Sequence, residues 1–219
     1  MNQTYRHLLN LYGCDSDCLT TAAQVEAALE PSLNNNYLER LLHQFSVDGL
    51  EQGVTGIYMW AGGHLSIHTW PERKMAAIDI ISPNDESPLV GRLMQNLPGR
   101  YVNVQEQAGA YNMGREAVGS FSQCAKLPKS SEEILHFLNK ASDEAGFNVV
   151  GRLSYDAGEQ IGAALVLSES HFALHVNKKR GIAYADCFTC GKEGDPCEGL
   201  EILTANLDPR NEKQSFMYR

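Results

Sequence analysis

The sequence predicts an α+β protein made of two homologous repeats, each an antiparallel sheet with helices on one face. Segments from the two halves match in the same order, which indicates an internal duplication. Each half also contains helix-start signals, followed by short runs rich in β-branched residues. Two such layers bury their remaining sheet faces best against each other. We therefore expect the repeats to pack as an αββα sandwich.

The duplication runs nearly from end to end. Three pairs of segments match in chain order: RHLLNLYGC (6–14) with REAVGSFSQC (115–124), VTGIYMWAGGHLSIH (54–68) with IGAALVLSESHFALH (161–175), and the helix-like PLVGRLMQNL (88–97) with PCEGLEILTANL (196–207). We place repeat 1 at residues 1–108 and repeat 2 at residues 109–219.

Helix signals occur early in each repeat. Thr21 with Gln24, and Ser130 with Glu133, have the spacing of capping boxes. Apolar residues at helical spacing then predict a helix over 38–45 and another after Ser130. The positions of the two apolar stripes are Leu38, Leu41, Leu42 and Phe45 upstream, and Ile134, Leu138 and Ala141 downstream.

Three short runs in each repeat predict strands because they are rich in β-forming residues. In HLSIHTW, a period of two puts His64, Ser66 and His68 on one face and the apolar neighbours on the other. The six runs are VTGIYMWA, HLSIHTW and KMAAIDII upstream, and AALVLS, HFALHVN and GIAYADCF downstream.

Composition narrows the class of protein. The 219 residues are 43% hydrophobic, enough for a globular core, and no apolar run has the length of a membrane span. The net charge of −9 disfavours binding to nucleic acid. We expect a cytoplasmic protein whose six cysteines are thiols. Cys187-x-x-Cys190 could form half of a zinc site, but no matching second pair exists, so we expect no metal.

RHLLNLYGC, QGVTGIYMWAGGHLSIHTWPE and SESHFALH followed by DCFTCG together resemble S-adenosylmethionine decarboxylases, over nearly the whole chain and twice. The resemblance implies self-cleavage between Glu169 and Ser170. It implies further that Ser170 becomes a pyruvoyl group, the covalent cofactor, which forms a Schiff base with an amino-acid-type substrate and promotes decarboxylation for polyamine and spermidine biosynthesis.

The resemblance also assigns roles to individual residues. Cys190, at the family's offset from Ser170, would donate the proton that follows loss of carboxylate. Thr55 occupies the position of a hydroxyl that assists processing. His68 is implied to be catalytic, and Glu72 of HTWPE is implied to bind substrate.

The two repeats lose these features in a complementary way. Repeat 1 has Gly62-Gly63 in place of the Glu-Ser pair and Pro83 in place of the cysteine. Repeat 2 has Gly162 in place of the hydroxyl, and no glutamate follows its HFALH segment. One complete residue set therefore survives across the chain. The remaining strand histidines, which we assign to packing or hydrogen bonding, are His64, His171 and His175.

The sequence leaves the substrate open. Family members have a phenylalanine that stacks on adenine, and here that position is Gly49. L-Ornithine or L-arginine therefore remain alternatives to S-adenosylmethionine, and a non-catalytic regulatory partner remains a third reading. The fused chain could act as a monomer or as a homodimer. Aromatic residues that could replace the stacking platform are Trp60, Trp70, Tyr58 and Phe121.

Overall fold

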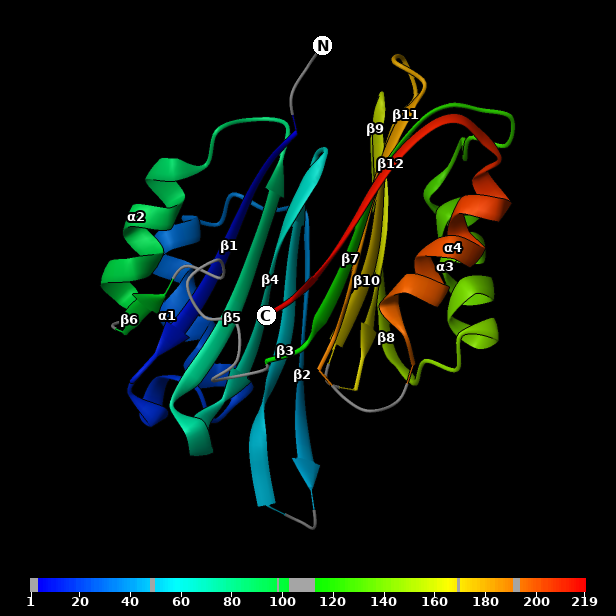
Figure 1. Cartoon of the computed structure of the whole chain (residues 1–219). Coiled ribbons are helices and arrows are strands. Elements are labelled where there is room, and N and C mark those ends of the chain that lie inside the picture. Colours follow the sequence, from blue (N-terminus) through cyan, green and yellow to red (C-terminus); the bar gives the residue numbers. More distant parts are fainter. Residues whose placement is uncertain (1–3, 48–49, 98, 103–112, 169, 191–193) are drawn as a thin grey trace. The chain divides into compact units, whose positions relative to one another are not determined.

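A computed structural model gives the fold of the chain, which divides into two compact units, Met1–Tyr111 and Asn112–Arg219. Each unit contains helices and one antiparallel sheet, which confirms the predicted α+β class (Figure 1). No helix in the described part of the chain is long and apolar enough to cross a membrane. The predicted repeat boundary at residue 108 lies outside the described residues. The residues whose structure is not described are 1–3, 48–49, 98, 103–112, 169 and 191–193.

The first sheet has six antiparallel strands in the order β2-β3-β4-β5-β1-β6. The three runs predicted as strands in repeat 1 are its β3, β4 and β5, as expected. The elements of this unit are β1 (Tyr5–Tyr12), η1 (Ser16–Cys18), α1 (Ala22–Leu33), β2 (Glu39–Val47), β3 (Leu50–Trp60), β4 (Gly63–Trp70), η2 (Pro71–Arg73), β5 (Met75–Ser82), α2 (Ser87–Asn96) and β6 (Arg100–Val102).

The second sheet repeats this topology. Its order, read from the opposite edge, is β8-β9-β10-β11-β7-β12, so each strand has its counterpart at the same place in the first sheet. A shared strand order confirms that the chain is an internal duplication. The elements of this unit are β7 (Arg115–Cys124), α3 (Ser131–Glu144), β8 (Val149–Ala157), β9 (Gln160–Leu167), β10 (Ser170–Asn177), β11 (Ile182–Thr189), α4 (Pro196–Leu207) and β12 (Pro209–Tyr218).

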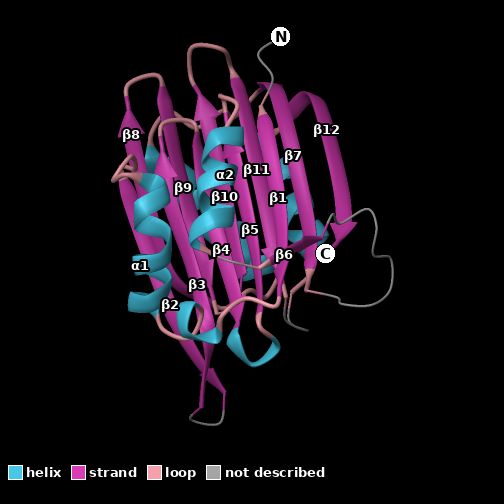
Figure 2. Cartoon of the chain, turned by 90° about the vertical axis from the view of Figure 1, so that its left-hand side faces the viewer, coloured by secondary structure: helices cyan, strands magenta, loops and turns pink. Residues whose placement is uncertain are grey.

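In each unit the helices cover one face of the sheet. Figure 2 looks onto the face of the first sheet that carries α1 and α2. In the second unit, Ile134 and Leu138 of α3 and Leu203 of α4 share a hydrophobic cluster with Phe172 and Leu174 of β10. Burial of these aliphatic and aromatic side chains is the main force that holds helix to sheet.

The predicted helix caps are present. Thr21 and Gln24 form a reciprocal capping box at the start of α1. Ser130 caps α3 by accepting a hydrogen bond from the backbone N–H of Glu133, while the Glu133 carboxylate accepts from Lys129. The local signals in the sequence therefore fixed where α1 and α3 begin.

The prediction of a helix over 38–45 was wrong, because residues 39–45 belong to the strand β2 and Leu38 directly precedes it. The backbone N–H of Leu38 donates to the carbonyl of Met59, and β2 then pairs along its length with β3. The proposed apolar stripe is not buried as a unit, since Leu38 is 52% exposed. Pairing with β3 satisfies the backbone of this edge segment, and it outweighs a local pattern that also fits a helix.

Candidate active site

Ser170 and Cys190 meet in unit 2, where the start of β10 lies beside the end of β11. Ser170 is the first residue of β10 and pairs with Leu167 of β9. The backbone N–H of Cys190, two residues beyond Phe188 in β11, donates a hydrogen bond to Ser170 Oγ over 3.2 Å. Ser170 is buried. Glu169, the other half of the predicted cleavage pair, lies outside the described residues.

The two cysteines of the CxxC pattern have different surroundings. Cys187 belongs to the hydrophobic cluster that also contains Leu200 and Leu203 of α4. Full burial raises the pKa of the Cys187 thiol well above its ordinary value. Cys190 is only partly buried. Cys187 therefore packs as an apolar residue, whereas Cys190, directly after the end of β11, lies beside Ser170.

His171, the residue after Ser170, makes a buried polar contact with β11. Its Nε2 lies 2.9 Å from Asp186 Oδ2, and both side chains are 0% exposed. Because a carboxylate only accepts hydrogen bonds, Nε2 carries the proton and donates it. The imidazole also stacks on Phe188, with ring centroids 6.3 Å apart and an interplanar angle of 26°. A hydrogen-bonding role was expected for His171, but no sequence pattern pointed to Asp186 as its partner.

Thr55 and His68 meet in unit 1, directly opposite each other on β3 and β4. Thr55 Oγ1 lies 3.2 Å from His68 Nδ1, and both side chains are buried. Next to this pair, the Thr69 hydroxyl accepts a hydrogen bond from the backbone N–H of Val54 and donates one to the carbonyl of Leu19, each over 2.8 Å. These contacts join the middle of β3 to the end of β4 next to the imidazole of His68.

Glu72 lies in the short turn η2 that directly follows β4. Its side chain is exposed and lies 3.6 Å from the guanidinium of Arg73. Exposed ion pairs of this kind contribute little to stability. The Glu72 carboxylate is therefore accessible to a ligand, two residues beyond the end of the strand that carries His68.

The counterpart of the Thr55–His68 pair has changed in unit 2. Gly162 lies opposite His175, as Thr55 lies opposite His68. In place of the missing hydroxyl, the phenol of Tyr155 lies 3.0 Å from His175 Nδ1; Tyr155 is on β8, where it pairs with Gly162 of β9. A side chain at Gly162 would place its Cβ 2.5 Å from the Tyr155 ring and 2.8 Å from that nitrogen. The glycine therefore makes room for a hydroxyl supplied by another strand, a contact that sequence reasoning missed.

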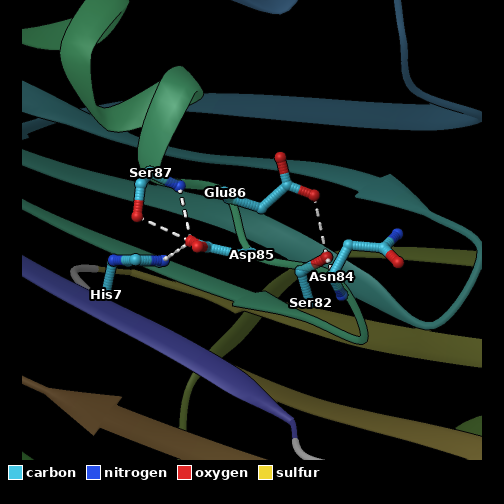
Figure 3. A network of polar contacts seen from close by, with 6 residues as sticks. All are labelled: His7, Ser82, Asn84, Asp85, Glu86 and Ser87. Atoms are coloured by element: carbon cyan, nitrogen blue, oxygen red, sulfur yellow. Dashed lines mark hydrogen bonds and ion pairs between the residues drawn. The ribbon is translucent and has the colours of Figure 1, made fainter.

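The counterpart of the Ser170–Cys190 corner has changed in unit 1. Pro83 follows β5 as Cys190 follows β11, and the turn there is held by its own polar contacts (Figure 3). The Ser82 hydroxyl donates to Glu86 over 2.9 Å and accepts from the backbone N–H of Asn84 over 3.1 Å. Residues 82–87 contain no thiol, so this corner holds no proton donor of the kind that Cys190 offers.

Asp85 is the centre of the same turn. Its carboxylate accepts hydrogen bonds from the Ser87 backbone N–H over 3.0 Å and from the Ser87 hydroxyl over 2.6 Å, and His7 Nε2 lies 3.7 Å away (Figure 3). The hydrogen bonds from Ser87 lower the pKa of Asp85 below its usual value. The carboxylate is thus held in its charged form beside the start of α2, a place that favours negative charge.

Three of the four aromatic residues that could replace the missing stacking platform lie in the helix-side cores. Tyr58 and Phe121 are buried members of the two hydrophobic clusters, and Trp60 packs against one of them. Trp70 is largely buried, but neither cluster contains it. Gly49 lies outside the described residues. Of the candidates, Trp70 alone has a side chain outside these cores.

Comparisons with known proteins find the same family in both halves of the chain. A family model described as S-adenosylmethionine decarboxylase matches residues 5–108 and again 115–219. The S-adenosylmethionine decarboxylase proenzyme of Methanococcus aeolicus is 37% identical over 100 residues, which cover 41% of this chain and 82% of the relative. The proenzyme of Aeropyrum pernix is 31% identical over 98 residues, which cover 44% and 75%. The crystal structure of the adenosylmethionine decarboxylase from Aquifex aeolicus VF5 aligns with 50% of this chain and 92% of its own, at 18% identity and a TM-score of 0.46.

Because the Tyr155 side chain occupies the space beside Gly162, we expect substitutions at these two positions to have coupled effects on stability. Gly162→Ala should lower the free energy of unfolding by about 1 to 3 kcal/mol, because the new Cβ collides with the Tyr155 ring. In a Tyr155→Ala background this cost should fall by at least about 0.5 kcal/mol. Urea unfolding of the four proteins of the cycle measures the coupling. Gly91→Ala, where a Cβ meets nothing within 4 Å, is the control and should be neutral or stabilising. Additive costs at Gly162 and Tyr155 would contradict the predicted collision.

Proposed function

We propose that this chain, which belongs to the S-adenosylmethionine decarboxylase family, cleaves itself before Ser170 and uses the resulting pyruvoyl group to decarboxylate S-adenosylmethionine for polyamine synthesis. The observation that carries the proposal is the contact of Ser170 Oγ with the backbone N–H of Cys190; the Glu169-Ser170 pair has Gly62-Gly63 as its counterpart in repeat 1. The name proenzyme, which the relatives carry, agrees with a chain that must be cut to become active.

The surroundings of Ser170 fit a serine that becomes the cofactor. Its hydroxyl accepts a hydrogen bond from Cys190, which leaves the hydroxyl proton available to a base and orients a lone pair of Oγ. Burial keeps bulk water away from the reacting atoms. A serine in free solution has neither advantage, because its hydroxyl is weakly nucleophilic and rotates among its rotamers.

The proposed self-cleavage takes place in three steps. The Ser170 Oγ forms an ester with the carbonyl carbon of Glu169 while the peptide bond between these residues breaks and its nitrogen becomes an amine. Removal of the Ser170 Cα proton then breaks the Cβ–Oγ bond, so Oγ leaves as part of the new carboxylate of Glu169. Addition of water and loss of ammonia convert the remaining unsaturated residue into a pyruvoyl group.

A pyruvoyl group derived from Ser170 would supply a ketone that can take up the substrate amine and serve as the electron sink for loss of the carboxylate. The substrate carbon must then receive a proton, and we assign this step to the Cys190 thiol. A thiol is a far stronger acid than a serine hydroxyl, so it can deliver a proton near neutral pH. The hydrogen bond that joins the Cys190 backbone to Ser170 places the thiol-bearing residue next to the reacting position.

Repeat 1 contributes the other part of the residue set in this proposal. His68, whose Nδ1 lies 3.2 Å from the Thr55 hydroxyl, brings an imidazole that can act as a base or an acid. Glu72 offers an exposed carboxylate that can accept ribose hydroxyls or pair with a cationic substrate group. The support for a shared set is the complementary loss described above, since each repeat has lost what the other keeps.

The substrate assignment rests on the relatives, which are named S-adenosylmethionine decarboxylase proenzymes. L-Ornithine and L-arginine remain the competing substrates, because position 49 is glycine and three of the possible replacement aromatics lie in hydrophobic cores. Both competitors carry the amine and the carboxylate that the chemistry needs. A release assay for carbon dioxide with all three compounds decides among them.

Purified wild-type protein should appear under denaturing mass spectrometry as a large fragment that ends at Glu169 and a small fragment that carries a pyruvoyl group. Ser170→Ala should remain one chain and release no carbon dioxide, because it lacks the attacking hydroxyl. An intact wild-type chain would favour the reading of a non-catalytic regulatory partner. Cleavage of the alanine variant at the same bond would refute the mechanism.

His68 and His175, at equivalent positions of the two repeats, allow a test of whether the function uses only the histidine of repeat 1. His68→Ala should lower the cut fraction or, in the cut protein, reduce kcat at least about tenfold. His175→Ala, at the equivalent position of repeat 2, should keep both the cut fraction and kcat near their wild-type values. Melting temperatures check that both variants are folded. Equal losses of activity in two folded variants would contradict the division.

Cys190→Ala should still cleave itself, at least partly, because the hydrogen bond to Ser170 comes from the backbone. Its kcat should fall about a hundredfold or more, because the proton donor is gone. Cys190→Ser keeps the size of the side chain but offers a much weaker acid, so it should restore little activity. Carbon dioxide release per mole of cut protein is the measurement. Wild-type turnover in Cys190→Ala would remove the thiol from the mechanism.

A further inference from the structure

We propose that the buried pair of His171 and Asp186 anchors the chain end that self-cleavage creates at Ser170, and thereby positions the reactive ketone. This inference rests on the proposed function, since an uncut chain has no end at this place. In this assignment His171 and Asp186 are positioning residues, and neither needs to touch the substrate. The argument depends only on contacts within unit 2.

An anchor is needed because cleavage removes two restraints at residue 170. The peptide bond to Glu169 is lost, so residue 170 becomes a chain terminus, and termini fray unless they are tied down. The hydrogen bond from the Cys190 N–H to Ser170 Oγ is lost as well, because Oγ leaves in the carboxylate of Glu169. The cofactor therefore forms at a chain end that has just lost its own side-chain contact.

His171 is the first residue after the new terminus whose side chain persists. Its Nε2–H donates to Asp186 Oδ2 over 2.9 Å, with both side chains 0% exposed. His171 pairs in register with Phe188, whereas Asp186 pairs with Ala173, so this hydrogen bond runs diagonally between β10 and β11. It ties the start of β10 to the strand that leads directly into Cys190.

The surroundings of the pair limit how far the imidazole can move. Phe188 stacks on the His171 ring, and the guanidinium of Arg219 lies 5.4 Å from the centre of the Phe188 ring on β11. Arg219 is itself 3.3 Å from Glu116 Oε2, in an ion pair with 0% exposed side chains. A hydrogen bond to a charged group in such buried surroundings is stronger than one exposed to water. Its loss should raise the population of frayed chain ends roughly tenfold to a hundredfold.

The chain offers a matched control on the same strand. Tyr155 and His175 form another buried polar contact, 3.0 Å long, which joins β10 to β8, the strand beyond β9. His175 lies near the opposite end of β10, since the strand runs from Ser170 to Asn177. Tyr155→Phe removes this hydrogen bond without altering the ring. It thus reports the effect of losing a buried contact at a distance from residue 170.

The test compares wild type, Asp186→Ala, Asp186→Asn and Tyr155→Phe in the self-cleaved protein. Fraying is measured by the rate at which a hydrazine labels the pyruvoyl ketone and by hydrogen exchange of the peptide that begins at residue 170. The values of kcat and KM for carbon dioxide release are measured alongside. Denaturing mass spectrometry gives the cut fraction, so every rate is expressed per mole of cut chain.

Asp186→Ala should label at least about tenfold faster than wild type, exchange faster near residue 170 and lose kcat with a smaller change in KM. Asp186→Asn keeps a weaker, neutral acceptor, so its labelling rate should lie between those of wild type and the alanine variant. Tyr155→Phe should label at the wild-type rate. If Asp186→Ala does not fold, the asparagine variant decides alone, because labelling at the wild-type rate overturns the anchor.

Two other outcomes would also overturn the inference. Equal labelling in wild type and Asp186→Ala would show that the pair does not restrain the chain end. Equal acceleration in Asp186→Ala and Tyr155→Phe would show general loosening of the sheet. A wild-type chain that stays uncut would overturn the proposed function. It would also overturn the anchor, because no chain end would form at Ser170. A cut, active wild type with unaffected Asp186 variants would overturn the anchor only.

Discussion

The antiparallel register of β10 against β11 is the constraint on which the candidate chemistry depends. Because the two strands run in opposite directions, the first residue of one lies beside the residue that follows the other. This arrangement brings the Cys190 backbone N–H within hydrogen-bond distance of Ser170 Oγ, and the Asp186 carboxylate within hydrogen-bond distance of His171. A shift of register by one residue would reverse the faces of all these side chains and separate both contacts.

Equivalent strands of the two sheets pair in the same register but carry different side chains. Thr55 opposite His68 and Gly162 opposite His175 are equivalent pairs in two sheets with one strand order. The backbone has therefore been kept while the side chains changed. In unit 2, Tyr155 on β8, the strand beyond β9, supplies a hydroxyl to His175, because a buried imidazole without a hydrogen-bond partner would be costly.

Divergence after duplication also explains why the two corners of the sheets differ. At the corner after β11, a backbone N–H and a serine hydroxyl meet beside a thiol. At the corner after β5, Pro83 begins a turn that Asp85 and Ser87 hold together. The second arrangement stabilises the start of α2, and residues 82–87 contain no thiol.

Sequence alone determined the features that arise from local or repeated patterns. The duplication, the starts of α1 and α3 and the central strands follow from residue order, because capping oxygens and apolar alternation act over a few residues. The sequence also showed that Ser170, Cys190 and His68 occupy positions within family-like motifs. The family resemblance came from the same short segments.

Only the tertiary structure decided what depends on partners far along the chain. Residues 39–47 form a strand because β3 supplies their backbone hydrogen bonds, although their apolar spacing fits a helix. Strand register brings Tyr155 to His175 and Asp186 to His171. Local sequence patterns contain no information on this register. Side-chain periodicity fixes which face a residue takes, but the pairing of distant strands fixes what it meets there.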